Sequence, residues 1–151
     1  MTKAVIFDVD GTLVDAVDHN AYAWQEAFRD HGYEVAFADI RGQIGKGDDQ
    51  LMPVFLTADD MEAHGKALEA HQGRIFRERY LVDIAAFPRV RELIERLRAD
   101  GKRIVLASSA KADDVEVFKK IAGITDLIEA EATSDDAERS KPHPDIFLAV
   151  L

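Results

Sequence analysis

The sequence predicts an α/β protein in which a parallel sheet lies between helices and a helical segment is inserted early in the chain. Residues 4–7 form a short apolar run, AVIF, which is typical of a buried strand. Residues 15–83 have an almost wholly helical pattern, and residues 84–151 alternate between helical and strand-like segments. Because strands that alternate with helices usually pair in parallel, the last pattern indicates a layered α/β core.

These patterns divide the chain into two predicted domains. Residues 1–14 and 84–151 are expected to form the core that contains the sheet. Residues 15–83 are expected to form a helical domain inserted between the first strand and the rest of the sheet. The chain has 151 residues, close to the usual size of one domain, so the core and a small insertion account for its length.

The insertion carries two predicted helices with a glycine-rich loop between them. Asp15 or Asp18 is expected to cap the first helix, because a carboxylate can accept a hydrogen bond from a free backbone amide there. Three glycines within six positions then break the chain. Thr57, followed three residues later by Asp60, resembles a capping box for a second helix over residues 58–80.

The last part of the chain alternates three predicted helices with two predicted strands. Apolar residues at positions i, i+3, i+4 and i+7 predict an amphipathic helix over residues 90–97, stopped by a following glycine. The remaining predictions are a strand at 103–107, a helix that begins at 113–114, a short strand at 127–130 and a helix at 145–151.

Two carboxylates follow the first strand directly. Asp8 and Asp10 lie one residue apart, before a sharp turn at Gly11 and Thr12. If the strand continued, both side chains would point to the same face, at the carboxyl end of the strand, where open α/β sheets place ligands. Two anions so close need a cation between them or a shared proton. Gly11 also allows the backbone to approach a phosphate closely.

Three segments together resemble the haloacid dehalogenase (HAD) superfamily of phosphohydrolases. FDVDGTLVD, LASSAK and SKPHPDIF are similar to its first, second and third motifs and occur in the same order. The resemblance covers residues 1–151 and implies a three-layer, Rossmann-like core with an inserted α-helical cap over the active site. A fourth motif, an acidic pair after another strand, does not follow the third, so the sequence is interpreted as truncated before it.

The resemblance also implies a role for each matching residue. Asp8 would be the nucleophile that forms an aspartyl-phosphate, and Asp10 the general acid and base. Lys141 would neutralise the charge on Asp8 and the phosphate. The implied cofactor is Mg²⁺, held by the Asp8 carboxylate and by Asp10 through its main-chain carbonyl. The residues expected to bind the phosphoryl group are Gly11, Thr12, Ser108 and Ser109.

The function implied by the resemblance is magnesium-dependent hydrolysis of a small phosphate monoester, within the phosphoglycolate phosphatase and β-phosphoglucomutase-like branch. Arg41 and Lys46, in the glycine-rich loop, are expected to contact the distal anionic group of the substrate. Two alternatives remain: a sugar-phosphate mutase with the same first steps, and an inactive, truncated chain. The mutase branch carries a phosphate-binding arginine where this chain has Gly47 or Lys46, which favours a phosphatase. Asp10 disfavours a dehalogenase, because dehalogenases of this superfamily lack the second acid.

Composition excludes several other classes of function. The 19 basic and 29 acidic residues give a net charge of −10, which would repel a nucleic acid but not a small phosphorylated metabolite. There is no cysteine, so thiolate chemistry and disulfides are excluded. No long apolar run predicts a membrane segment or a signal peptide, so a cytoplasmic location is expected. If no further strand covers the first one, the exposed sheet edge would favour self-association.

Overall fold

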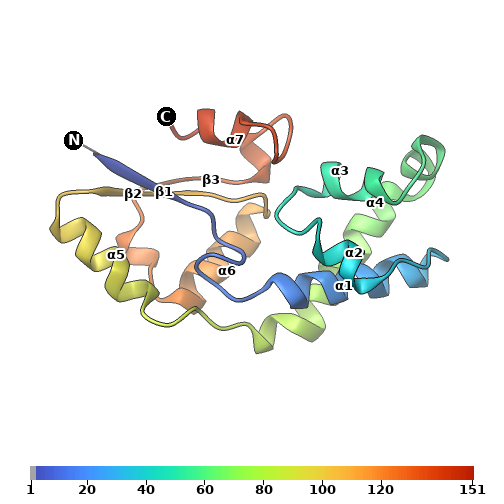
Figure 1. Ribbon diagram of the computed structural model, residues 1–151, viewed down its shortest axis with the longest axis horizontal. Coiled ribbons are helices and arrows are strands. Elements are labelled where there is room, and N and C mark those ends of the chain that lie inside the picture. Colours follow the sequence, from blue (N-terminus) through green and yellow to red (C-terminus); the bar gives the residue numbers. More distant parts are fainter. Residues whose placement is uncertain (1–2) are drawn as a thin grey trace. The chain divides into compact units, whose positions relative to one another are not determined.

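The computed structural model describes residues 3–151 and divides the chain into two compact units (Figure 1). The first unit comprises Met1–Asp15 and Ala85–Leu151, and the second comprises Ala16–Ile84. Each unit has its own buried side chains and is described by itself.

A three-stranded parallel sheet organises the first unit. Its strands are β1 (Ala4–Phe7), β2 (Arg103–Ala107) and β3 (Ala130–Ala132), in the spatial order β1-β2-β3. Phe7 pairs with Leu106, and Leu106 pairs with Glu131, so the carboxyl ends of the three strands lie at one edge. The predicted α/β class with a parallel sheet is therefore confirmed, and β1 is an edge strand of the sheet formed by the described residues.

Helices cover both faces of this sheet. In Figure 1, α5 (Val90–Ala99) and α6 (Ala112–Ala122) lie on one side of the strands and α7 (Asp145–Leu148) lies on the other. The stripe of apolar residues that predicts α5 places Ile94 in the core with none of its surface exposed.

Two of the predicted bounds in this unit are wrong. The third strand begins at Ala130 rather than at 127, because Thr125–Leu127 form a 3-10 turn that buries the Leu127 side chain. The apolar residue Leu127 was predicted to begin the strand, but it is apolar because its side chain is buried in this turn. The last helix, α7, ends at Leu148 and is shorter than expected.

A buried lysine joins α6 to β3. The Lys119 ammonium lies 2.7 Å from a carboxylate oxygen of Glu116, one turn earlier, and 2.7 Å from one of Glu131 on β3. Burial alone would lower the pKa of Lys119, but the hydrogen bonds to the two carboxylates raise it above its ordinary value. The lysine therefore stays charged and connects the helix to the strand.

The chain leaves and re-enters the first unit at a single place. The Asp15 amide donates to the Ala85 carbonyl at 2.9 Å, and the Phe87 amide donates to the Leu13 carbonyl at 3.0 Å. These hydrogen bonds form a short antiparallel bridge that closes the segment after β1 against the segment before α5.

Helices make up the second unit. Its α-helices are α1 (Val17–Asp30), α2 (Phe37–Arg41), α3 (Asp48–Leu51) and α4 (Ala58–Ile75). Met52–Val54 and Leu81–Asp83 are 3-10 turns, and Phe76–Tyr80 continues α4 as a π-helical turn. Trp24 and Phe28 of α1, whose rings contact each other, and Leu68 of α4 are buried in this unit. Gln72 of α4 donates to Asn20 of α1 at 2.7 Å, which satisfies a largely buried amide.

The two predicted helix caps in this unit have different outcomes. Thr57 caps α4 as expected, and its hydroxyl oxygen accepts a hydrogen bond from the Asp60 amide at 3.2 Å. The prediction for α1 is wrong, because its N-cap residue is Ala16, with no side-chain cap. Asp18 lies inside the first turn, and its carboxylate binds the Arg41 guanidinium at 2.6 Å instead.

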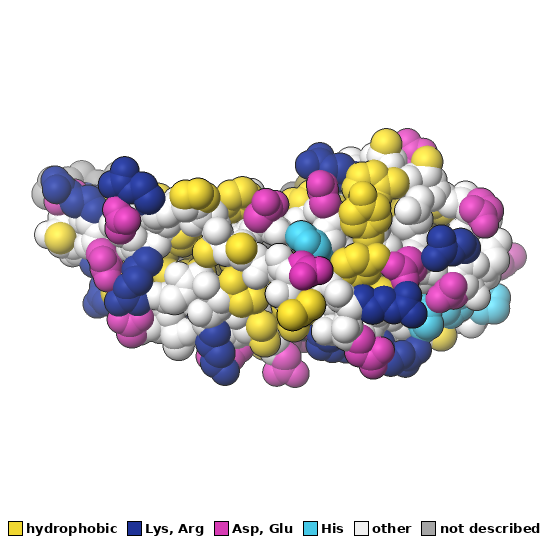
Figure 2. Space-filling model, turned by 90° about the horizontal axis from the view of Figure 1, so that it is seen from below, with side chains coloured by type: hydrophobic (Ala, Val, Ile, Leu, Met, Phe, Trp, Pro, Cys, Tyr) yellow, Lys and Arg dark blue, Asp and Glu magenta, His cyan; other side chains and the backbone are white. Residues whose placement is uncertain are grey.

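Charged side chains are spread over the surface. On the face drawn in Figure 2, Lys and Arg side chains are interspersed with Asp and Glu side chains rather than gathered by sign. Two ion pairs between residues four positions apart are examples of this arrangement: Arg91 with Glu95 on α5, and Arg96 with Asp100, the residue that follows α5. Within residues 3–151, no helix is both long and apolar enough to cross a membrane.

The cap of α4 gives a test of stability. Replacing Thr57 with Ala removes the acceptor of the Asp60 amide and should lower the free energy of unfolding by about 1 kcal/mol. Thr57→Ser keeps a hydroxyl and should cost much less. Urea unfolding of the three proteins, followed by far-UV circular dichroism, measures the difference. Equal losses for Ser and Ala would show that the hydroxyl does not cap α4.

Candidate active site

Asp8 lies directly after β1, at the carboxyl edge of the sheet. Its Oδ1 atom accepts a hydrogen bond from the Lys141 ammonium at 2.7 Å. Its Oδ2 atom lies 3.4 Å from the Thr12 hydroxyl, which is long for a hydrogen bond between oxygens. The Asp8 side chain is 38% exposed, so one oxygen is held by a cation while the carboxylate can still be reached from solvent.

A tight turn follows Asp8. The Val9 carbonyl accepts hydrogen bonds from the amides of Thr12, Leu13 and Val14, and the Gly11 amide donates to the Val14 carbonyl at 2.8 Å. Gly11 has a φ of 75°, a left-handed conformation that side chains disfavour and that glycine adopts without strain.

The sequence argument for Asp10 needs a correction. It assumed that the strand continues through both carboxylates, but β1 ends at Phe7. The turn after Val9, and not the alternation of a strand, therefore places Asp10. The Asp10 side chain is half-buried and its Oδ1 atom is buried.

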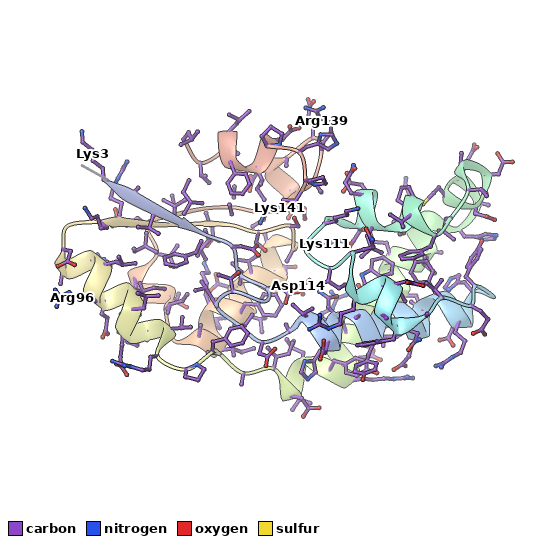
Figure 3. All side chains as sticks on the ribbon, in the orientation of Figure 1. Lys3, Arg96, Lys111, Asp114, Arg139 and Lys141 are labelled. Carbon is purple, nitrogen blue, oxygen red and sulfur yellow. The ribbon has the colours of Figure 1, made fainter. Side chains whose placement is uncertain are left out.

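Lys141 joins the ends of two strands. Its ammonium donates to Asp8 Oδ1 after β1 and, at 2.8 Å, to the carbonyl oxygen of Ala107, the last residue of β2. It also lies 5.4 Å from the centre of the Phe147 ring on α7, within range of a cation–π contact. The side chain is 15% exposed. Figure 3 labels Lys141 and shows it beside the carboxyl ends of the strands.

The serines of the second motif follow β2. Ser108 is buried, its amide donates to the Ala132 carbonyl at 3.0 Å, and its hydroxyl oxygen accepts from the Ala110 amide at 3.1 Å. The hydroxyl thus stabilises the turn after β2 and keeps a hydrogen that it can donate. Ser109 comes next and is half-buried. Because Ser108 adjoins Ala107, whose carbonyl binds Lys141, the turn after β2 borders the contact between Asp8 and Lys141.

The two residues predicted in the glycine-rich loop belong to the other unit. Arg41 is paired with Asp18, and the Lys46 ammonium donates to the Gln43 side-chain oxygen at 2.6 Å. Both therefore have partners within their own unit. The residues that the first unit brings together are Asp8, Thr12, Ala107, Ser108 and Lys141, with Asp10 and Gly11 in the turn between the first two.

The residues after β1 are suited in kind to Mg²⁺. Carboxylate and carbonyl oxygens are the donors that Mg²⁺ prefers, and Asp8 with Asp10 supplies them. Among residues 3–151, no group of three or more His, Asp or Glu side chains lies close enough together to hold a metal ion. A magnesium ion at this site would therefore be bound by few protein atoms, with water and phosphate oxygens in its other positions, as is common for this ion.

Sequence reasoning missed two contacts of Lys141. The Ala107 acceptor is a main-chain carbonyl. Every residue type has such a carbonyl, so the sequence could not indicate this contact. Phe147 lies six residues after Lys141 in the third motif, and an aromatic residue at that place was a usable signal, because α7 brings it back to the lysine.

Comparisons with known proteins show what the whole chain is similar to. Among curated proteins, the chain is 33% identical over 154 residues to SUPPRESSOR OF QUENCHING 1 of Arabidopsis thaliana, which covers 97% of this chain and 14% of that protein. It is 29% identical over 148 residues to a phosphoglycolate phosphatase of Nitrosospira multiformis, covering 94% of this chain and 65% of that enzyme. The chain thus spans less than two thirds of the length of either relative.

A solved structure and a family model complete the comparison. The crystal structure of a hydrolase from Pseudomonas syringae matches 99% of this chain and 68% of its own chain, with a TM-score of 0.88 and 29% sequence identity. The family model of haloacid dehalogenase-like hydrolases matches residues 2–151. The resemblance carried by the three sequence motifs is therefore confirmed, and the chain belongs to the haloacid dehalogenase-like hydrolase family.

Proposed function

We propose that this protein hydrolyses a small phosphate monoester, with Asp8 as nucleophile and Mg²⁺ as cofactor. The main support is the position of Asp8, whose carboxylate is 38% exposed at the carboxyl edge of the sheet and is bound by the Lys141 ammonium at 2.7 Å. The similarity to a phosphoglycolate phosphatase supports a small phosphorylated metabolite as the substrate. A cytoplasmic location and the exclusion of nucleic-acid and membrane partners stay predictions.

In the first proposed step, an Asp8 oxygen attacks phosphorus and forms an aspartyl-phosphate. The bond from phosphorus to the substrate oxygen breaks, and Asp10 donates a proton to the leaving alcohol. The Lys141 ammonium offsets negative charge on Asp8 and on the phosphoryl oxygens as the two anions approach.

In the second proposed step, Asp10 accepts a proton from a water molecule. The water oxygen attacks phosphorus, the bond to Asp8 breaks, and inorganic phosphate and the free carboxylate are released. Thr12, Ser108 and Ser109 would donate hydrogen bonds to the phosphoryl oxygens from the turns after β1 and β2. Gly11, whose amide donates to the Val14 carbonyl, would allow the backbone to approach the phosphate closely. Mg²⁺ bound by Asp8 and the Asp10 carbonyl would offset further negative charge there.

The helical unit would act as the cap, with Arg41 and Lys46 selecting the substrate through its distal anionic group. A sugar-phosphate mutase would share the first step but transfer the phosphoryl group back to a sugar. Product analysis distinguishes the two, since a phosphatase releases inorganic phosphate and a mutase yields an isomeric sugar phosphate. An inactive chain would yield neither product.

Replacing Asp8 tests the nucleophile. Asp8→Asn keeps the shape of the side chain but removes the attacking charge, so turnover should fall at least about 10³-fold. Asp113→Asn, an exposed carboxylate at the start of α6, is the matched control and should leave turnover nearly unchanged. Steady-state release of phosphate measures both. An Asp8→Asn protein with turnover close to that of the wild type would contradict the mechanism.

Replacing Asp10 tests proton transfer. Asp10→Asn should lower turnover more than substrate binding, and the loss should be greatest for substrates with poor leaving groups. An aryl phosphate with an acidic phenol needs little protonation and should lose less than an alkyl phosphate. Comparing kcat for the two substrates measures the effect. Equal losses would assign Asp10 a structural or metal-positioning role only.

Replacing the cap residues tests substrate selection. Arg41→Ala or Lys46→Ala should raise KM for the preferred metabolite, once a screen of phosphate monoesters has found it. Turnover of a generic aryl phosphate should change little, because that substrate lacks a distal anionic group. Lys66→Ala, an exposed lysine on α4, is the control. If both substrates respond alike, neither residue selects the substrate.

A further inference from the structure

We propose that Asp145 and Arg139 form a clamp that positions Lys141, so that Asp145 is a positioning residue for the reaction. The inference rests on the proposed function, in which Lys141 must hold its place beside Asp8. The clamp closes the seven-residue segment 139–145, here called the lysine loop.

The Asp145 carboxylate binds both the main chain and the side chain of Arg139. Its Oδ2 atom accepts hydrogen bonds from the Arg139 amide and from Nε, each at 3.2 Å, and its Oδ1 atom accepts from Nη2 at 3.0 Å. The hydrogen bond from the Arg139 side chain holds the pKa of Asp145 below its usual range, and the clamp therefore carries both charges at neutral pH.

A surface ion pair often contributes little, and the Arg139 side chain is 60% exposed. Three features set this pair apart. The Asp145 side chain is only 17% exposed. The guanidinium binds through two nitrogens, which fixes its orientation as well as its distance. The third hydrogen bond comes from the backbone, so the carboxylate fixes the path of the chain itself.

The far end of the lysine loop is anchored in the core. Asp145 is the first residue of α7, and the next residue, Ile146, is 1% exposed in a hydrophobic cluster with Ala107 and Ala132. The same short helix carries Phe147, whose ring lies beside the Lys141 ammonium. Through Asp145, the near end of the loop at Arg139 is therefore tied to a helix that packs on β2 and β3.

Lys141 lies inside the lysine loop and has a long, flexible side chain. Its ammonium must meet Asp8 Oδ1 at 2.7 Å and the Ala107 carbonyl at 2.8 Å, and both acceptors belong to the sheet. The position of the lysine backbone decides whether the side chain reaches them. Two short polar contacts require that the backbone be held closely, and the clamp supplies that restraint.

Asp145→Asn tests the clamp, because Asn keeps the shape but loses the charge and one acceptor oxygen. Turnover should fall by about 10- to 100-fold, with a smaller change in KM. Asp126→Asn is the matched control, because Asp126 binds Arg91 through two hydrogen bonds of 2.8 and 3.0 Å in the same unit, away from the lysine loop. Equal effects of the two variants on turnover would overturn the proposal.

A double-mutant cycle tests whether Asp145 acts through Lys141. On a Lys141→Ala background, Asp145→Asn should cause no further loss of turnover. If Asp145→Asn instead lowers turnover by the same factor in the Lys141→Ala background as in the wild type, Asp145 has an independent, structural role and the proposal is overturned. If circular dichroism shows that Asp145→Asn does not fold, Arg139→Gln replaces it in the cycle. This variant breaks the clamp at its exposed residue.

A measurement without turnover separates the clamp from the proposed function. The rate at which acetic anhydride acetylates Lys141, followed by peptide mass spectrometry, should rise several-fold in Asp145→Asn and stay unchanged in Asp126→Asn. An unchanged rate in Asp145→Asn would refute the clamp. If the wild-type protein shows no phosphatase turnover, the proposed function fails while this rate still decides whether Asp145 holds Lys141.

Discussion

The contact of the Lys141 ammonium with Asp8 and the Ala107 carbonyl is the interaction on which the candidate site depends. Asp8 and Asp10 place two carboxylates within one turn, and such neighbours repel each other unless positive charge lies close by. The ammonium supplies this charge at 2.7 Å from Asp8, from a position 133 residues later in the chain. The parallel sheet makes the contact possible, because it places the residues after β1 and β2 at one edge and brings the third motif back beside them.

Hydrogen bonds restrain the backbone on both sides of Asp8. Before it, β1 pairs with β2 in a fixed parallel register. After it, the Val9 carbonyl accepts hydrogen bonds from three amides. The hydrogen bond from the Asp15 amide to the Ala85 carbonyl then holds the end of this segment. Main-chain hydrogen bonds therefore hold the turn that carries the two carboxylates. In the proposed mechanism this arrangement places the nucleophile without the cost of ordering a flexible loop during the reaction.

Local patterns in the sequence predicted the elements that local forces decide. The bounds of β1 and β2 were correct because polar or turn-forming residues flank each apolar run, and the Thr57 cap was correct because it joins residues three positions apart. Predictions failed where a tertiary contact decided the outcome. Asp18 binds Arg41 instead of capping α1, and Leu127 is buried in a turn instead of starting a strand. The Ala107 carbonyl and the Arg139–Asp145 clamp could not be predicted, because neither a backbone acceptor nor a partner across a loop leaves a periodic pattern.

The most direct test of this account is to trap the phosphoryl group on the enzyme. The protein is mixed with p-nitrophenyl phosphate and Mg²⁺, quenched with acid during turnover and reduced with borohydride, which converts an aspartyl-phosphate to homoserine. Peptide mass spectrometry then identifies the modified residue. The account predicts homoserine at position 8 in the wild-type protein and none in Asp8→Asn. Release of phosphate with position 8 unmodified, or with the modification at another carboxylate, would contradict it.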